Sequence, residues 1–174
     1  MFKPDINFVH KYFMEEKQAG LIFLVIGSLA MIVAIVCFFV IKSNPSFFKG
    51  LAIPLIAVGL IQGIVGYTVY SRSNQQRKDT AYQMGLEPVP FVKTNELPRM
   101  QKVMKSFSIL MIVEIVLLVV GIGLFLYFNK STDKMFWKGL GLSLAIMALL
   151  SGVLDFLAEK RGKQYTSELT KMIQ

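Results

Sequence analysis

Four apolar runs constrain the fold of this 174-residue chain more than any other feature. Each run holds 20 to 24 residues, and about 20 residues of helix are enough to cross a bilayer. The runs comprise residues 18–41, 50–71, 106–129 and 139–158, and they contain only two acidic or basic residues, Glu114 and Asp155. The sequence therefore predicts an all-α polytopic membrane protein with four transmembrane helices.

The composition argues against a soluble domain. Hydrophobic residues make up 54% of the chain, and the mean hydropathy is +0.55. A soluble chain of this length has too little interior to bury four helices that are apolar on every side. The first run is also longer than the apolar part of a cleavable signal peptide, so we expect it to stay in the protein.

The distribution of basic residues predicts the orientation. The N-terminal arm, the 72–105 loop and the C-terminal tail carry three, seven and four Lys and Arg, against five in the two short connections. Positive residues concentrate on the cytoplasmic side of membrane proteins. We therefore expect a multi-pass protein of the cell inner membrane with both termini cytoplasmic. Its net charge of +8 suits anionic lipid headgroups, and we expect no nucleic-acid partner.

An internal repeat is visible when the chain is shifted by 89 residues. Phe47-Phe48-Lys49-Gly50-Leu51 then aligns with Phe136-Trp137-Lys138-Gly139-Leu140. We expect two tandem helical hairpins, residues 18–85 and 106–174, joined by a cytoplasmic linker at 86–105. Because each hairpin crosses the membrane twice, the repeats are parallel and related by an axis along the membrane normal.

Small residues recur on one face of the second helix of each hairpin. They are Gly59, Gly63 and Gly66 in the first and Ala148 and Gly152 in the second. Their spacing of three and four predicts a stripe on which another helix can approach closely. The stripe serves internal packing in one interpretation, and contact with a second copy or another protein in the other.

Polar helical segments are predicted next to the spans. Residues 1–17 form an amphipathic arm, which we expect to lie in the inner membrane interface or to dock on a partner. Its apolar face comprises Phe2, Ile6, Val9 and Phe13. The second helix of each hairpin should continue into the cytoplasm. The first extension is predicted to end at Gly85, and residues 88–90, Pro-Val-Pro, to be extended.

The two acids are the leading candidate functional residues. Glu114 lies about 12 Å inside the cytoplasmic end of its span, and Asp155 lies at a similar level on the following span. Charges at this depth are costly, so both should face the protein interior, share a proton or reach a cation. They have a structural role in one interpretation, and a partner-binding, coupling or proton-carrying role in the others. Gln62 is the third candidate: we expect it to bond a neighbouring helix, and contact with a partner or ligand is the alternative.

Catalytic signatures are lacking. His10 is the only histidine and Cys37 the only cysteine, and neither has a partner at metal-binding spacing. We find no phosphate-binding glycine loop and no nucleophile motif. The sequence therefore predicts no catalytic residues, no metal and no cofactor.

The segment 97–105, Leu-Pro-Arg-Met-Gln-Lys-Val-Met-Lys, followed by Phe107 and by Glu114-Ile115, resembles small four-span bacterial inner-membrane proteins. Such proteins include immunity proteins that protect the membrane against secreted toxins. The resemblance implies a non-catalytic binding protein with a toxin as its partner. The alternative is a small proton- or cation-coupled transporter or exporter subunit. Because four spans enclose little volume, that function would require a homodimer.

Overall fold

The computed structural model describes residues 7–174, which are mostly helical and contain no strand. The helices are α1 (Asn7–Ile35), α2 (Pro45–Leu86), α3 (Pro88–Phe91), α4 (Leu97–Tyr127) and α5 (Met135–Met172). Short π-helical segments follow α1 and α3 at Val36–Val40 and Val92–Glu96, and a 3-10 turn precedes α5 at Thr132–Lys134. The helices α1, α2, α4 and α5 are long and apolar enough to cross a membrane. The predicted all-helical, four-span architecture is therefore confirmed at this level.

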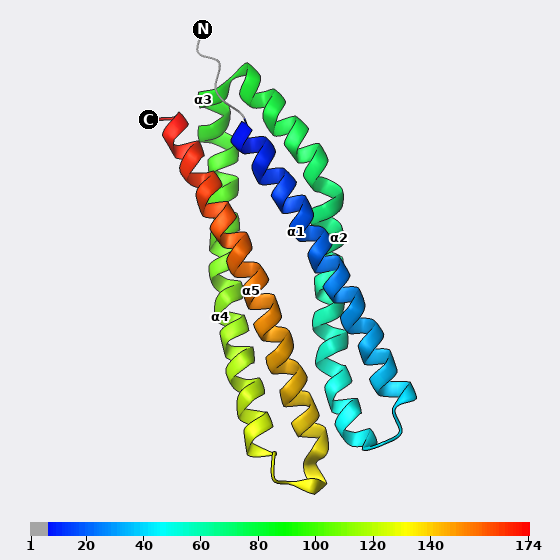
Figure 1. Ribbon diagram of the computed structural model, residues 1–174. Coiled ribbons are helices and arrows are strands. Elements are labelled where there is room, and N and C mark those ends of the chain that lie inside the picture. The colour runs from blue at the N-terminus through cyan, green and yellow to red at the C-terminus, as the bar shows by residue number, and fades with distance from the viewer. Residues whose placement is uncertain (1–6) are drawn as a thin grey trace.

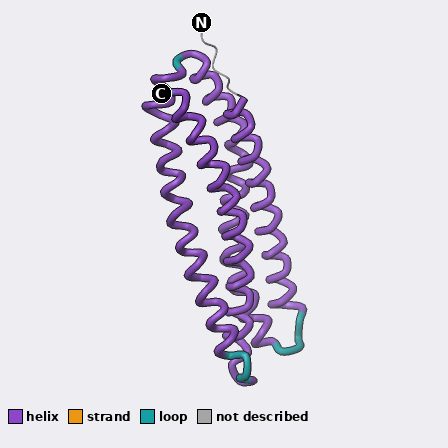
Figure 2. The backbone as a smooth tube through the Cα atoms, turned by 60° about the vertical axis from the view of Figure 1, so that its left-hand side comes forward, coloured by secondary structure: helices purple, strands orange, loops and turns teal. Residues whose placement is uncertain are grey.

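The long helices form two antiparallel hairpins, α1 with α2 and α4 with α5 (Figure 1). Helix α2 packs against α5 and joins the hairpins, and α1 also contacts α5. Both hairpin loops lie at one end of the molecule, which we call the loop end (Figure 2). The start of α1, the end of α5 and α3 lie at the other end, which we call the terminal end.

Glycines bring α1 and α2 into backbone contact. A methyl group on Gly27 would lie 2.5 Å from the carbonyl oxygen of Gly59, and one on Gly66 would lie 2.6 Å from that of Gly20. No side chain fits at these distances. The two helices can approach this closely only because the residues at their contact are glycines.

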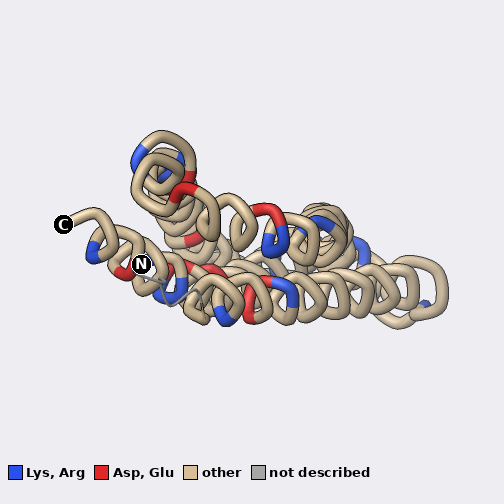
Figure 3. Tube along the Cα trace, turned by 90° about the horizontal axis from the view of Figure 1, so that it is seen from above, with Lys and Arg blue, Asp and Glu red and all other residues tan. Residues whose placement is uncertain are grey.

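Two clusters of buried hydrophobic residues lie at the two ends of the molecule. The terminal core draws residues from α1, α2, α4, α5 and the segment before α4, and consists of Val9, Tyr12, Phe13, Met84, Val92, Met100, Tyr165 and Leu169. The loop-end core joins α1, α2 and α5, and consists of Ala30, Ala34, Cys37, Ala52, Leu55 and Met147. Acidic and basic residues are interspersed at the terminal end of the molecule, as Figure 3 shows in a view from that end.

The N-terminal arm differs from its prediction. Residues 7–17 are the first turns of α1, and the helix continues without a break into the apolar run. Val9 and Phe13 are fully buried in the terminal core, so their apolar face packs on this chain instead of lying in a membrane interface. Phe2 and Ile6 lie outside the described residues.

The linker between the hairpins also differs from its prediction. Helix α2 runs through Gly85 to Leu86, and Pro88 then opens the short helix α3. Only Glu87, at φ −136° and ψ 75°, departs from helical geometry between them. Proline fits the first turn of a helix because its missing N–H has no intrahelical partner there, so the Pro-Val-Pro segment is helical and not extended.

Candidate functional site

Glu114 and Asp155 meet between α4 and α5. Their carboxyl groups are in hydrogen-bond contact, and only 9% of Glu114 is exposed. The Oε2 atom of Glu114 is buried and has no hydrogen-bond partner among the described residues. It lies beside Gly152, where a methyl group would be 3.4 Å away. The Glu114 carboxyl group therefore packs against the small residue Gly152 of α5.

A groove of about 260 Å³ adjoins this acid pair. It is lined only by α4 and α5, and Glu114 is its one charged residue. The other lining residues are Met111, Ile115, Leu118, Ala148, Leu149, Gly152, Val153, Phe156 and Leu157. About half of the surface of Ile115, Val153 and Phe156 is exposed, so the groove opens on the outside of the helix pair and not between the hairpins.

The first hairpin has no acid pair at the corresponding level. A shift of 89 residues places Val25 opposite Glu114 and Gly66 opposite Asp155. Gly66 packs directly on the backbone of Gly20 and Leu24, so α1 and α2 are in contact at this level. In the second hairpin, Asp155 stands where the first has that glycine, and the groove lies beside it.

Gln62 makes a separate contact, on the α2–α5 interface. Its Nε2 donates a hydrogen bond of 2.8 Å to the Ser151 hydroxyl. Gln62 is 4% exposed, and its Oε1 has no partner among the described residues. The structure therefore does not bring Gln62 into the acid pair. Its hydrogen bond joins the two hairpins, as the sequence suggested for this residue.

The predicted stripe of small residues divides into two groups. Gly59 and Gly66 contact α1 closely, whereas a methyl group on Gly63 would meet nothing within 4 Å. Ala148 and Gly152 line the groove, and a methyl group on Gly152 would meet only the Glu114 side chain within 4 Å. Helices α4 and α5 come into close backbone contact nearer the loop end, at Gly121 and Gly141.

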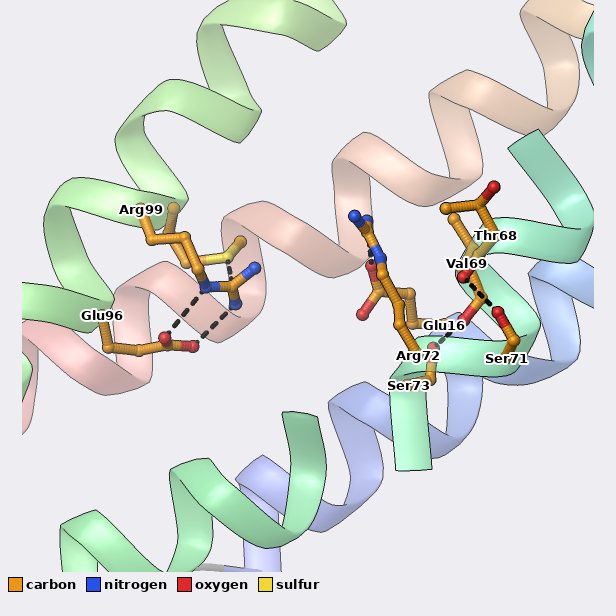
Figure 4. Close-up of polar contacts among 9 residues, drawn as sticks. Glu16, Thr68, Val69, Ser71, Arg72, Ser73, Glu96 and Arg99 are labelled. Atoms are coloured by element: carbon orange, nitrogen blue, oxygen red, sulfur yellow. Dashed lines mark hydrogen bonds and ion pairs between the residues drawn. The ribbon is translucent and has the colours of Figure 1, made fainter. Parts of the chain in front are cut away.

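The terminal core contains a polar cluster that the sequence does not predict. Glu96 is 3% exposed and accepts two hydrogen bonds from Arg99, of 2.9 Å to Nε and 2.7 Å to an NH group (Figure 4). The Tyr165 hydroxyl donates a third, of 2.8 Å. Tyr12 stacks on Tyr165 with ring centroids 4.1 Å apart. The Glu96–Arg99 spacing of three was the only sequence signal for it.

Burial controls the ionisation of this cluster. It raises the pKa of Tyr165 far above the ordinary value, and the neighbouring Glu96 carboxylate raises it further. Burial would lower the pKa of Arg99, but its hydrogen bond and charge contact with Glu96 outweigh that effect and raise it. Tyr165 therefore stays a hydrogen-bond donor and Arg99 a cation at any working pH.

A second acid–base contact lies nearby, at the base of the apolar runs. Glu16 and Arg72 approach within 3.9 Å, and half of the Arg72 side chain is exposed (Figure 4). Burial raises the pKa of Glu16, and Arg72 opposes that effect. The Oε2 atom of Glu16 has no hydrogen-bond partner in the described part of the chain. This pair is therefore loosely made, unlike Glu96 with Arg99.

Residues 7–174 bring no three His, Cys, Asp or Glu side chains together in a group that could hold a metal ion. Comparison with protein-family models, with curated proteins and with solved structures gives no match to this chain.

Proposed function

We propose that this chain is a non-catalytic binding protein of the cell inner membrane, with both termini and the terminal core in the cytoplasm. The excess of Lys and Arg in the segments at the terminal end supports this orientation. The same residues favour contact with anionic headgroups on that side. Helices α1, α2, α4 and α5 are the proposed membrane spans.

We further propose that the body is a duplicated hairpin. Contacts between the hairpins support this, because they join positions that the 89-residue shift relates. Gly50 packs on the backbone of Phe136, and Gly139 packs on the backbone of Phe47 in the same way. Gln62 bonds its own counterpart, Ser151. A twofold axis along the membrane normal, passing between α2 and α5, would produce these reciprocal contacts.

The α4–α5 groove is the proposed binding surface, and its acid pair is the observation that carries the proposal. A buried carboxyl group inside a membrane is costly and is retained where it has a use. The pair occurs in one hairpin only, so general packing does not require it. An open apolar groove beside a polar pair suits a membrane-inserted partner. Neutralising a membrane-targeting toxin, as immunity proteins do, is the specific form of this function that we propose.

Capture from native membranes in mild detergent tests this function. The tagged wild-type chain should retain one partner in a fixed ratio, and the Glu114→Gln/Asp155→Asn variant should lose it. Glu168→Gln is the matched control, because Glu168 is a partly exposed carboxylate in the tail of α5 that pairs with Lys171, away from the groove. Cells without this gene should then be killed only when they meet the captured partner. A partner that binds both variants equally would contradict the proposed surface.

The acid pair also favours a second candidate, a proton- or cation-coupled exporter subunit that acts as a homodimer. This function requires a path between the two sides of the membrane, whereas the groove is lined by one helix pair only. Vesicles that contain the purified chain separate the two functions. Proton-linked flux that Glu114→Gln abolishes, with the assembly intact, would support the exporter and contradict the binding protein.

A further inference from the structure

The Oε2 atom of the Glu114 carboxyl group lacks a hydrogen-bond donor among the described residues. It is buried beside Gly152, on the carboxyl group that meets Asp155. Buried polar atoms in folded proteins are normally hydrogen-bonded. The side chain is more than nine-tenths buried and belongs to the lining of an open groove. A donor is therefore missing, and the groove is the route by which one can reach this carboxyl group.

A cation is the donor that this site favours. Two carboxyl groups stand together, and none of the lining residues is Lys, Arg or His. A protonated amine supplies three N–H donors and a positive charge, while the pair supplies acceptors and negative charge. The groove walls are apolar, so they suit the methylene stem that carries a lysine ammonium group.

The depth of the site favours a polypeptide as the carrier of that amine. Glu114 lies eight residues, or about 12 Å, inside its span. The amine of a lipid or a free amphiphile stays at the headgroup level, where it is hydrated. A lysine on an inserted helix is held at its own depth and needs a counter-ion there. The groove volume of about 260 Å³ lies below the usual range for small-molecule pockets and suits one side chain.

We propose that the α4–α5 groove receives a membrane-inserted partner helix whose lysine ammonium group pairs with Glu114 and Asp155. This inference rests on the proposed binding function and names the partner's chemistry. The lysine stem lies between the apolar side chains of α4 and α5, and its ammonium group donates to Glu114 Oε2. The first hairpin offers no such site, since Gly66 closes the corresponding level.

A synthetic transmembrane peptide tests the inference directly. The probe is a leucine–alanine helix of about 22 residues with one lysine about 12 Å from its end. A matched peptide carries leucine at that position. Energy transfer between labelled peptide and labelled protein, in vesicles of phosphatidylethanolamine and phosphatidylglycerol, measures association. We expect the lysine peptide to bind the full chain at least tenfold more tightly than the leucine peptide.

Variants of the acid pair test whether Glu114 and Asp155 cause the preference for the lysine peptide. Glu114→Gln/Asp155→Asn should remove the tenfold difference, whereas Glu114→Asp, which keeps a carboxyl group, should retain most of it. Glu168→Gln should leave it unchanged, and circular dichroism should show the same helix content in every variant. Equal binding of the two peptides by the wild type overturns the inference, as does a lysine preference that survives loss of both acids.

The peptide and capture experiments fail independently. If a native partner depends on the acid pair but the lysine peptide shows no preference, the proposed function stands and the lysine inference falls. If the lysine peptide binds as expected but no native partner depends on the pair, the chemistry of the site stands and the proposed function falls.

Discussion

Alanine substitutions at Gly59, Gly63 and Gly66 should give three different effects on stability, although the three residues share one helix. The reason is what a methyl group would meet at each position. At Gly66 it would lie 2.6 Å from the carbonyl oxygen of Gly20, at Gly59 it would lie 3.0 Å from that of Gly27, and at Gly63 it would meet nothing within 4 Å.

The magnitudes follow from how far the helices must separate. Ordinary contact begins at 3.4 Å. At Gly66 the nearest atom is the backbone nitrogen of Leu24, which lies closer than the Gly20 oxygen, so Gly66→Ala forces α1 and α2 apart by about 1 Å, whereas Gly59→Ala forces them apart by about 0.4 Å. Overpacking of this kind costs about 1–3 kcal/mol. We expect a loss of about 2 kcal/mol for Gly66→Ala and about 1 kcal/mol for Gly59→Ala. Gly63→Ala should be neutral or should stabilise by about 0.5 kcal/mol, because alanine restricts the unfolded chain.

Reversible unfolding by SDS in mixed micelles, followed by circular dichroism, measures these changes. A loss of about 2 kcal/mol is roughly a 30-fold shift in the unfolding equilibrium, which the method resolves easily. Gly63→Ala serves as the internal control, since it adds the same methyl group to the same helix. Equal effects at Gly63 and Gly66 would refute the close backbone contact between α1 and α2.

Three further outcomes are expected. Tyr165→Phe removes a hydrogen bond to the charged, buried Glu96 and should cost about 2 kcal/mol, seen as faster hydrogen exchange at the terminal end. Ser151→Ala removes the partner of Gln62 and should cost only about 0.6 kcal/mol in SDS unfolding, the average for hydrogen bonds between membrane helices. Glu16→Gln should gain stability relative to wild type as the pH rises, measured by melting in detergent between about pH 4 and pH 8.

The sign of the last outcome follows from linkage. Burial raises the folded-state pKa of Glu16, so its favourable contribution is complete below the unfolded pKa and is lost as the pH rises through the folded value. Glutamine does not titrate, and its advantage therefore grows with pH. A melting difference for Glu16→Gln that is the same at every pH would contradict this account.

Tyr82→Phe, at an exposed tyrosine, is the control for Tyr165→Phe and should leave hydrogen exchange at the terminal end unchanged.

The long apolar helices could be predicted because hydrophobic length alone determines them. The common level of Glu114 and Asp155 could also be predicted, since a helix has a known rise per residue and both acids lie a few residues from the same end of their apolar runs. The direct contact of the two acids and the groove beside them could not be predicted. Both depend on how α4 rotates against α5, and glycines at the loop end, Gly121 and Gly141, set that packing.

The terminal core could not be predicted from the sequence, because its residues are far apart in the chain. Tyr12 and Tyr165 stack across 153 residues, and no local pattern relates them. The apolar face of residues 1–17 is therefore predicted to lie in the membrane interface or to dock on a partner, because the sequence does not reveal that this face packs on α5. The Pro-Val-Pro segment that begins at Pro88 is predicted to be extended because proline breaks the interior of a helix. In the structure these prolines lie in the first turn of α3, where proline fits.

The terminal core has a consequence for how this protein assembles. Val9 and Leu169 belong to one buried cluster, so the beginning of α1 cannot complete its packing until the end of α5 has been made. Each hairpin has its own antiparallel contacts and can enter the bilayer as soon as its second helix emerges. Synthesis thus leaves an early intermediate with an exposed apolar N-terminal face, and the last turns of α5 close it. In the proposed orientation this face lies in the cytoplasm, where chaperones and proteases would distinguish unfinished chains from finished ones by it.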